Sequence, residues 1–206
     1  MKVLIIDGSP RRGGNCDTLI SEMTKVFTSL NVEAETLCVA QKSISGCLSC
    51  GYCGEHGRCV VDDIVNVAAT KFEEADGMIV VSPVYFGSPN GSVISFLDRL
   101  FYSTSYSKRY KVGAAFAVAR RGGTVASFDV LNKYFTISGM PVASGDYWNN
   151  AFGREKGQAK QDAEGMRNAR VVAKRMVFLM KAIADAKANY PELLSEEPRV
   201  FTHFIH

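Results

Sequence analysis

The first thirty residues place a short strand directly before a loop and an amphipathic helix. Val3 to Ile6 form an apolar run of β-branched and aliphatic residues, long enough for one buried strand. Apolar side chains then recur at helical spacing, at Leu19, Ile20, Met23, Val26, Phe27 and Leu30. A strand that turns through a loop into a helix directs free backbone N–H groups and the positive end of the helix dipole toward that loop. The segment therefore predicts a binding site for a phosphate group.

The loop itself narrows the kind of phosphate. Gly8 and Gly13 have the spacing of a P-loop, but Gly14 and Asn15 stand where that motif requires Lys and Ser or Thr. The G-x-G-x-x-G pattern of dinucleotide-binding proteins is missing as well. The loop suits a terminal monophosphate without Mg²⁺, held by helix amides and by Ser9, Arg11 and Asn15. The alternative is an ordinary strand–helix turn with solvated arginines.

Composition limits the class of protein. A chain of 206 residues with 47% hydrophobic residues is expected to form one soluble domain with an ample core. The net charge of +3 is too small to indicate nucleic-acid binding. We expect neither a signal peptide nor a membrane segment, because the chain begins with a strand-like run and contains no apolar run of spanning length. Six cysteines in such a chain favour the cytoplasm, and metal or redox chemistry over disulfides.

Four of those cysteines form a compact motif. Cys47, Cys50, Cys53 and Cys59 read C-x2-C-x2-C-x5-C, with glycines between them that let the backbone curl tightly. Three thiolates at successive x2 spacing can wrap one face of a [4Fe–4S] cluster, and the fourth closes it. Zinc is the second choice, because structural zinc sites usually use two separated C-x2-C pairs. A loop of reduced thiols without metal is the third. His56 lies inside the loop and is expected to be solvated rather than a ligand.

The rest of the chain alternates strands and helices. Further strands are predicted at 34–39, 77–82, 111–119 and 141–145. Helices are predicted at 64–74, 125–139 and 158–187, and another helix is expected to begin with Ser88 as its N-cap and Pro89 in its first turn. This pattern predicts a doubly wound α/β fold, a flavodoxin-like parallel five-stranded sheet of order 2-1-3-4-5 with helices on both faces. We expect a single domain over 1–206, with a cysteine-rich insertion at about 43–61.

Two further loops follow strands that are neighbours of the first strand in this sheet. One contains Pro83, Val84, Tyr85, Phe86 and Gly87, and the other contains Arg120, Arg121, Gly122 and Gly123. In open α/β sheets, ligands bind at the carboxyl ends of the strands. A monophosphate site beside backbone and aromatic walls, in which Tyr85 and Phe86 can flank a flat ring, predicts FMN as the ligand.

The three loops together resemble a known family. Gly8-Ser-Pro-Arg-x3-Asn15, Ser82-Pro-Val-Tyr-Phe-Gly-Ser88 and Ala119-Arg-Arg-Gly-Gly123 resemble the NADPH-dependent FMN reductase branch of flavodoxin-like proteins, and the cysteine loop is similar to that of iron-sulfur flavoproteins in this branch. The resemblance implies FMN bound by all three loops. It also implies a homodimer or homotetramer in which the cluster of one subunit approaches the flavin of another. Cys16 stands where such loops carry Ser or Thr, so one hydroxyl bond to the phosphate is lost or weakened.

The expected activity is that of an FMN-dependent oxidoreductase. It would take electrons from NAD(P)H or a ferredoxin and pass them to a small-molecule or protein acceptor such as quinone, flavin or oxygen. The alternatives are a cluster-free reductase and a flavodoxin-type electron carrier; carriers tend to be acidic around the flavin, whereas this chain has arginines there. Apolar residues of the tail, Phe201, Phe204 and Ile205, are expected to dock on the body or on a partner subunit, and the Tyr147-Trp148 loop to lie between subunits.

Overall fold

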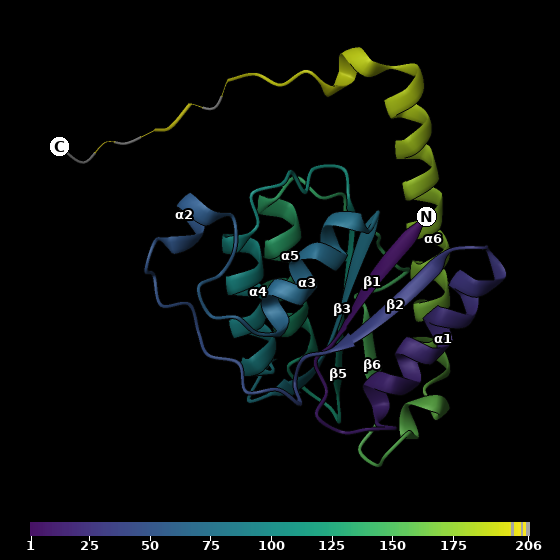
Figure 1. The fold of residues 1–206 in the computed structure, drawn as a ribbon. Helices are drawn as coiled ribbons and strands as arrows, with labels where there is room; N and C mark the ends of the chain where they lie inside the picture. The colour runs from purple at the N-terminus through teal and green to yellow at the C-terminus, as the bar shows by residue number, and fades with distance from the viewer. Residues whose placement is uncertain (199, 203, 205–206) are drawn as a thin grey trace.

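A parallel β-sheet forms the centre of the protein. The structure is a computed structural model that describes residues 1–198, 200–202 and 204. The parallel strands are β1 (Lys2–Asp7), β2 (Glu33–Cys38), β3 (Gly77–Tyr85), β5 (Val112–Ala119) and β6 (Asn150–Phe152). Their order, β2-β1-β3-β5-β6, is the flavodoxin-like order predicted from the sequence (Figure 1).

Helices cover both faces of the sheet. The first face carries α1 (Asn15–Ser29) and α6 (Ala163–Asn189), and the second carries α3 (Ile64–Glu74), α4 (Gly91–Ser103) and α5 (Thr124–Ile137) (Figure 1). Because side chains alternate along a strand, β1 directs Val3 and Ile5 into the first core and Leu4 and Ile6 into the second. The short helix α2 (Tyr52–His56) lies in the cysteine-rich loop.

The last strand of the sheet is not where the sequence predicted it. Residues 141–145 form only an isolated bridge between Gly113 and Val142. The edge strand is β6, which directly follows the Tyr147-Trp148 loop and pairs with Ala117, Val118 and Ala119 of β5. The chain leaves the sheet after this bridge and returns at Asn149, whose carbonyl accepts a bond of 3.0 Å from the N–H of Ala117. The order of the sheet is unaffected.

The loop after β3 also differs from the prediction. β3 continues to Tyr85 and turns back through Phe86 and Gly87 into the short strand β4 (Ser88–Pro89). Ser88 is therefore not the N-cap of the next helix, because Pro89 pairs with Val84. The cap is Asn90, whose Oδ1 accepts from the N–H of Ser92 at 3.0 Å and whose Nδ2 donates to the carbonyl of Gly8 at 2.9 Å. This side chain joins the start of α4 to the loop after β1.

The C-terminal part of the chain begins with a 3₁₀ turn, Gln158–Gln161, and α6 follows with Asp162 as its cap. The predicted docking of the tail on the chain's own body is wrong for Phe201 and Phe204, which are exposed because the tail runs away from the sheet beyond α6 (Figure 1). Docking of these residues on a partner subunit stays a prediction, and Ile205 lies outside the described residues. Within the described part of the chain, no helix is both long enough and apolar enough to cross a membrane.

Candidate functional site

A cavity of about 250 Å³ lies at the carboxyl ends of the central strands. It receives residues from the loops after β1, β3, β5 and β6, where the topology of the sheet places a ligand. Its lining comprises Ser9, Arg11, Asn15, Cys16, Pro83, Val84, Tyr85, Val118, Ala119, Arg120, Gly153 and Arg154. The structure thus brings together some of the predicted residues from each of the three loops.

The start of α1 faces this cavity with free amide groups. Gly14 is the N-cap of α1 and offers no side chain to the first-turn N–H groups. Ser9 is buried beside it, and its Oγ accepts from the N–H of Arg11 at 3.2 Å. An uncapped helix start beside a buried hydroxyl and an arginine matches the requirements of a phosphate group.

Two carboxylates lie under this loop. Asp17 accepts a short hydrogen bond from the N–H of Gly13. Asp7, 5% exposed at the end of β1, accepts from the N–H of Ser9 at 2.8 Å. Burial raises the pKa of Asp7 to about 6, and the negative charge of Asp17 adds to the effect. Two carboxyl groups in the loop partly offset the positive potential of the arginines.

Asn15 lines the cavity, and its side chain also makes two hydrogen bonds to distant parts of the chain. Its Nδ2 donates to the carbonyl of Gly153 at 2.9 Å, and its Oδ1 accepts from the N–H of Ala159 at 3.0 Å. A Cβ on Gly153 would lie 2.7 Å from Asn15 Nδ2, so only glycine permits this approach. The side chain therefore fastens the segment after β6 to α1, and this segment carries Arg154 into the cavity wall.

Sequence reasoning missed four lining residues: Val118, Ala119, Gly153 and Arg154. The first two are the last residues of the strand that precedes Arg120. Extending the predicted site by two residues toward the N-terminus would have included them. The last two follow β6, which has only three residues and offers too short a pattern for prediction.

The other predicted residues lie beside the cavity rather than in its described wall. They are Phe86, Gly87, Arg121, Gly122 and Gly123. Gly123 has φ of 86°, and a Cβ there would lie 2.8 Å from the Cα of Gly87, so the loops after β3 and β5 pack directly against each other. Phe86 is fully exposed with φ of 51°, a conformation that costs a bulky residue about 1–2 kcal/mol.

Two thiols belong to the surroundings of this cavity. Cys16 is 2% exposed, and burial raises its pKa. Cys38 is half-buried with its Sγ 3.7 Å from the carbonyl oxygen of Ser9, and burial raises its pKa as well. Since the thiolate is the reactive form, neither side chain has the character of a nucleophile.

The remaining four cysteines surround a second cavity of about 390 Å³. Cys47, Cys50, Cys53 and Cys59 all line it as free thiols, together with apolar side chains and Arg99. Among the described residues, no group of three or more Cys, His, Asp or Glu side chains converges closely enough to hold a metal ion. His56 is exposed, as predicted for a solvated loop residue, and stacks on Tyr52 with ring centroids 3.8 Å apart.

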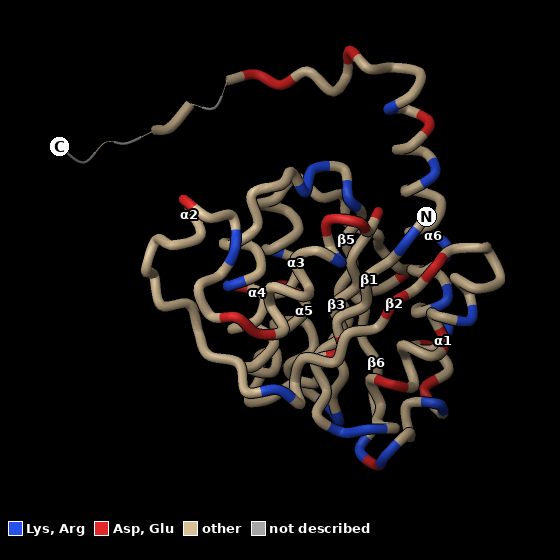
Figure 2. The backbone as a smooth tube through the Cα atoms, in the orientation of Figure 1, with Lys and Arg blue, Asp and Glu red and all other residues tan. Residues whose placement is uncertain are grey.

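The two cavities have no lining residue in common. The cysteine-rich loop leaves the carboxyl end of β2 and runs past α4 to α2, away from the loop after β1 (Figure 1). Figure 2 shows basic segments in the loops at the carboxyl end of the sheet, and others at its opposite end and along α6.

Comparisons with known proteins bear on the family and on the fold. The profile of the family described as NADPH-dependent FMN reductase matches residues 1–155. An iron-sulfur flavoprotein of Methanocaldococcus jannaschii is 33% identical over 191 residues, which cover 89% of this chain and 99% of that protein. One of Methanosarcina thermophila is 32% identical over 188 residues, covering 89% and 97%. A crystal structure of RosB with a bound riboflavin-phosphate intermediate has a TM-score of 0.72 at 16% identity, covering 100% of this chain and 91% of that one.

Proposed function

Because the chain belongs to the NADPH-dependent FMN reductase family, we propose that it is an iron-sulfur flavoprotein that passes electrons between a reduced donor, FMN and an acceptor. The donor is NAD(P)H or a ferredoxin, and the acceptor is a quinone, a flavin, oxygen or a protein. FMN, when bound, supplies transfer of a hydride or of single electrons. One observation carries the proposal: the first turn of α1, which has no side-chain cap, and residues from four strand ends line the same cavity.

The residues of this cavity fit FMN. The first-turn amides of α1, the hydroxyl of Ser9 and the guanidinium of Arg11 would hold the phosphate. Pro83, Val84 and Tyr85 would form one wall for the ring, with Phe86 and Gly87 at its edge. Arg120 and Arg154 would contribute positive charge, while Arg121, Gly122 and Gly123 shape the loop. Cations around the cavity favour the enzyme over a flavodoxin-type carrier.

The second cavity fits an iron–sulfur cluster. Its lining contains four thiols, and thiolates are the ligands that such clusters use. The ligands of a cubane bind different iron atoms, so they need to surround a common cavity rather than converge on one point. Cys47, Cys50, Cys53 and Cys59 are the proposed ligands of a [4Fe–4S] cluster. Six free thiols also favour a reducing compartment such as the cytoplasm.

We also propose that residues 1–206 form one domain with its cysteine-rich insertion at about 43–61, and that the protein works as a homodimer or homotetramer. The separation of the two cavities within one chain supports assembly, since a second copy can bring its cluster to the flavin. Tyr147 and Trp148 are exposed and available for such an interface. Light scattering that reports a particle of 22.5 kDa at micromolar concentration would contradict the assembly.

The test is anaerobic purification from iron-replete cells. We expect about one FMN and about four irons and four sulfides per chain, with bleaching of the flavin absorbance on addition of NAD(P)H or a reduced ferredoxin. Protein with FMN but without iron would reduce the proposal to a cluster-free reductase. Protein that binds no FMN would refute it.

A further inference from the structure

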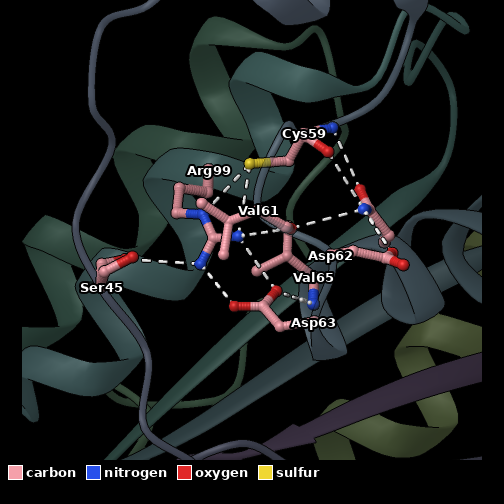
Figure 3. A network of polar contacts seen from close by, with 8 residues as sticks. Ser45, Cys59, Val61, Asp62, Asp63, Val65 and Arg99 are labelled. Carbon is pink, nitrogen blue, oxygen red and sulfur yellow. Dashed lines mark hydrogen bonds and ion pairs between the residues drawn. The ribbon is translucent and has the colours of Figure 1, made fainter.

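One arginine of the second core points at a proposed cluster ligand. Arg99 lies on α4 between apolar core residues and is 2% exposed. Its Nε and Nη2 each lie 3.3 Å from the Sγ of Cys59 (Figure 3). It also donates two bonds to the Asp63 carboxylate, at 2.7 and 3.0 Å, and one to the carbonyl of Val61 at 3.0 Å. With a further contact of 3.5 Å from Nη1 to the carbonyl of Ser45, the guanidinium is divided between a carboxylate, a sulfur and two backbone carbonyls.

A buried charge is costly unless it is paired, and Asp63 provides the pairing. The Asp63 carboxylate is itself fixed, because its Oδ1 also accepts from the N–H of Val65 at 2.9 Å and so caps α3. Neutralising Arg99 requires only this carboxylate. The two remaining N–H contacts also need an acceptor in this buried position, and the acceptor that the fold supplies is the sulfur of Cys59. These contacts connect α4 to the cysteine-rich loop.

Cys59 has more contacts with the folded body than the exposed cysteines of its loop, Cys47 and Cys50. Its backbone N–H donates to Asn66 Oδ1 at 3.0 Å, and its carbonyl accepts from Asn66 Nδ2 at 3.1 Å. Arg99 fixes the sulfur. Cys47 and Cys50 are exposed, and the sulfur of Cys47 accepts only from the N–H of Ser49, two residues further along its own loop. One thiol is therefore positioned by the folded body, whereas the exposed ones depend on their loop.

We propose that Arg99 is a positioning residue that presents the sulfur of Cys59 to the cluster and keeps two hydrogen bonds to it once the cluster is bound. This rests on the proposed function, since it takes Cys59 as a ligand. Hydrogen bonds and positive charge at ligand sulfurs favour the form that carries the added electron, so they raise the reduction potential. Arg99 thereby sets the position of the Cys59 sulfur and the reduction potential of the cluster. The arginine stays protonated, so this one-electron step involves no proton transfer from it.

The experiment compares Arg99→Met and Arg99→Lys with Arg58→Met in the anaerobically purified protein with FMN and cluster. Arg58 is the matched control, because it adjoins Cys59 in sequence but is exposed and pairs with Asp62 at 3.1 Å. Three quantities are measured: iron and sulfide per chain, the rate of iron loss to a chelator, and the midpoint potential by redox titration followed by electron paramagnetic resonance.

Arg99→Met is expected to lower the one-electron reduction equilibrium constant about tenfold or more, which is about 59 mV, and to speed iron loss by a similar factor. Arg99→Lys keeps the charge but cannot donate to Asp63 and to the sulfur at the same time. Its reduction potential should therefore lie between those of the wild type and Arg99→Met. Arg58→Met should match the wild type. If Arg99→Met fails to fold, Arg99→Lys still decides, because retained FMN shows that it is folded.

Wild-type potential and chelator resistance in either Arg99 variant with a full iron content would overturn the inference and leave the proposed function intact. Wild-type protein that contains no iron would overturn both.

Discussion

The two cavities differ in what holds them in place. The walls of the cavity proposed for FMN come from four strand ends, which are joined across the sequence by Asn90 to Gly8 and by Asn15 to Gly153. The walls of the cysteine cavity come largely from one exposed loop, which Arg99 ties to α4. FMN is a finished molecule and can bind to a site that is already formed. An iron–sulfur cluster forms bonds to its cysteines as it assembles, and those bonds can order the loop that carries them.

The largest expected effect tests whether the cysteine cavity is independent of the other. Cys50→Ser should reduce the iron of anaerobically purified protein from about four atoms per chain to less than about one, because a ligand is lost. FMN should remain bound, since its cavity shares no residue with the loop. Iron analysis and the visible spectrum measure both. Cys38→Ser, outside the loop, should keep its iron, and loss of FMN from Cys50→Ser would show that the two cavities are coupled.

The next effect concerns the charge under the FMN cavity. Since burial raises the pKa of Asp7 from 3.8 to about 6, the folded state binds an extra proton between these values. Ionised Asp7 therefore destabilises the fold, and its contribution to the free energy of unfolding falls as pH rises through this window, by up to about 3 kcal/mol. Asp7→Asn keeps an acceptor for the N–H of Ser9. It should unfold at higher urea than wild type at pH 8 and show no such gain at pH 4.

The matched control is Asp129→Asn, an exposed carboxylate on α5. Its urea midpoint should follow wild type across the same pH range, measured in FMN-free protein. An equal gain in both variants would mean that net charge, and not the buried position, is responsible.

A smaller effect separates two neighbouring arginines. Arg11→Ala should weaken FMN binding by about 1.5–3 kcal/mol, the usual contribution of a hydrogen bond to a charged group. Arg12→Ala should leave the affinity unchanged, because Arg12 is bonded to Gln41 at 3.0 Å and lies outside the cavity wall. Fluorescence titration with FMN and with riboflavin measures this. Riboflavin lacks the phosphate and should bind all three proteins equally; a loss with riboflavin would place Arg11 at the ring instead.

The smallest effect tests the thiol in the helix start. Cys16→Ser places a hydroxyl in the first turn of α1, where the family resemblance implies Ser or Thr, and should strengthen FMN binding by about 1 kcal/mol. The side chain is almost fully buried, so an unpaired hydroxyl in the FMN-free protein should also lower its stability slightly. Titration and thermal unfolding of the same samples give both values. Unchanged affinity would place the phosphate away from Cys16.

The sequence was informative where its patterns were long. β1, the loop after it and α1 were predicted because an apolar run is followed by six apolar positions at helical spacing. β6 has three residues and was missed, and Arg154 was missed with it. Asn15 was predicted as a phosphate ligand, which stays a prediction; its bonds to residues 138 and 144 positions away had no signal in the sequence and are shown only by the folded chain. The role of Arg99 could not be predicted from its helix, because its partners Cys59 and Asp63 are 40 and 36 residues away in the sequence.

The carboxylate of Asp17 bears on how the empty protein takes up its ligand. It accepts from the N–H of Gly13 in the same loop that would receive a phosphate. An anion that binds this N–H has to displace the Asp17 carboxylate. Because that carboxylate is tethered to the same segment, its effective concentration at the N–H is on the order of millimolar. Such internal competition discriminates against free inorganic phosphate, which has no further contacts to offer. A ligand that carries its phosphate on a large planar body can compensate for the displacement with the rest of its surface.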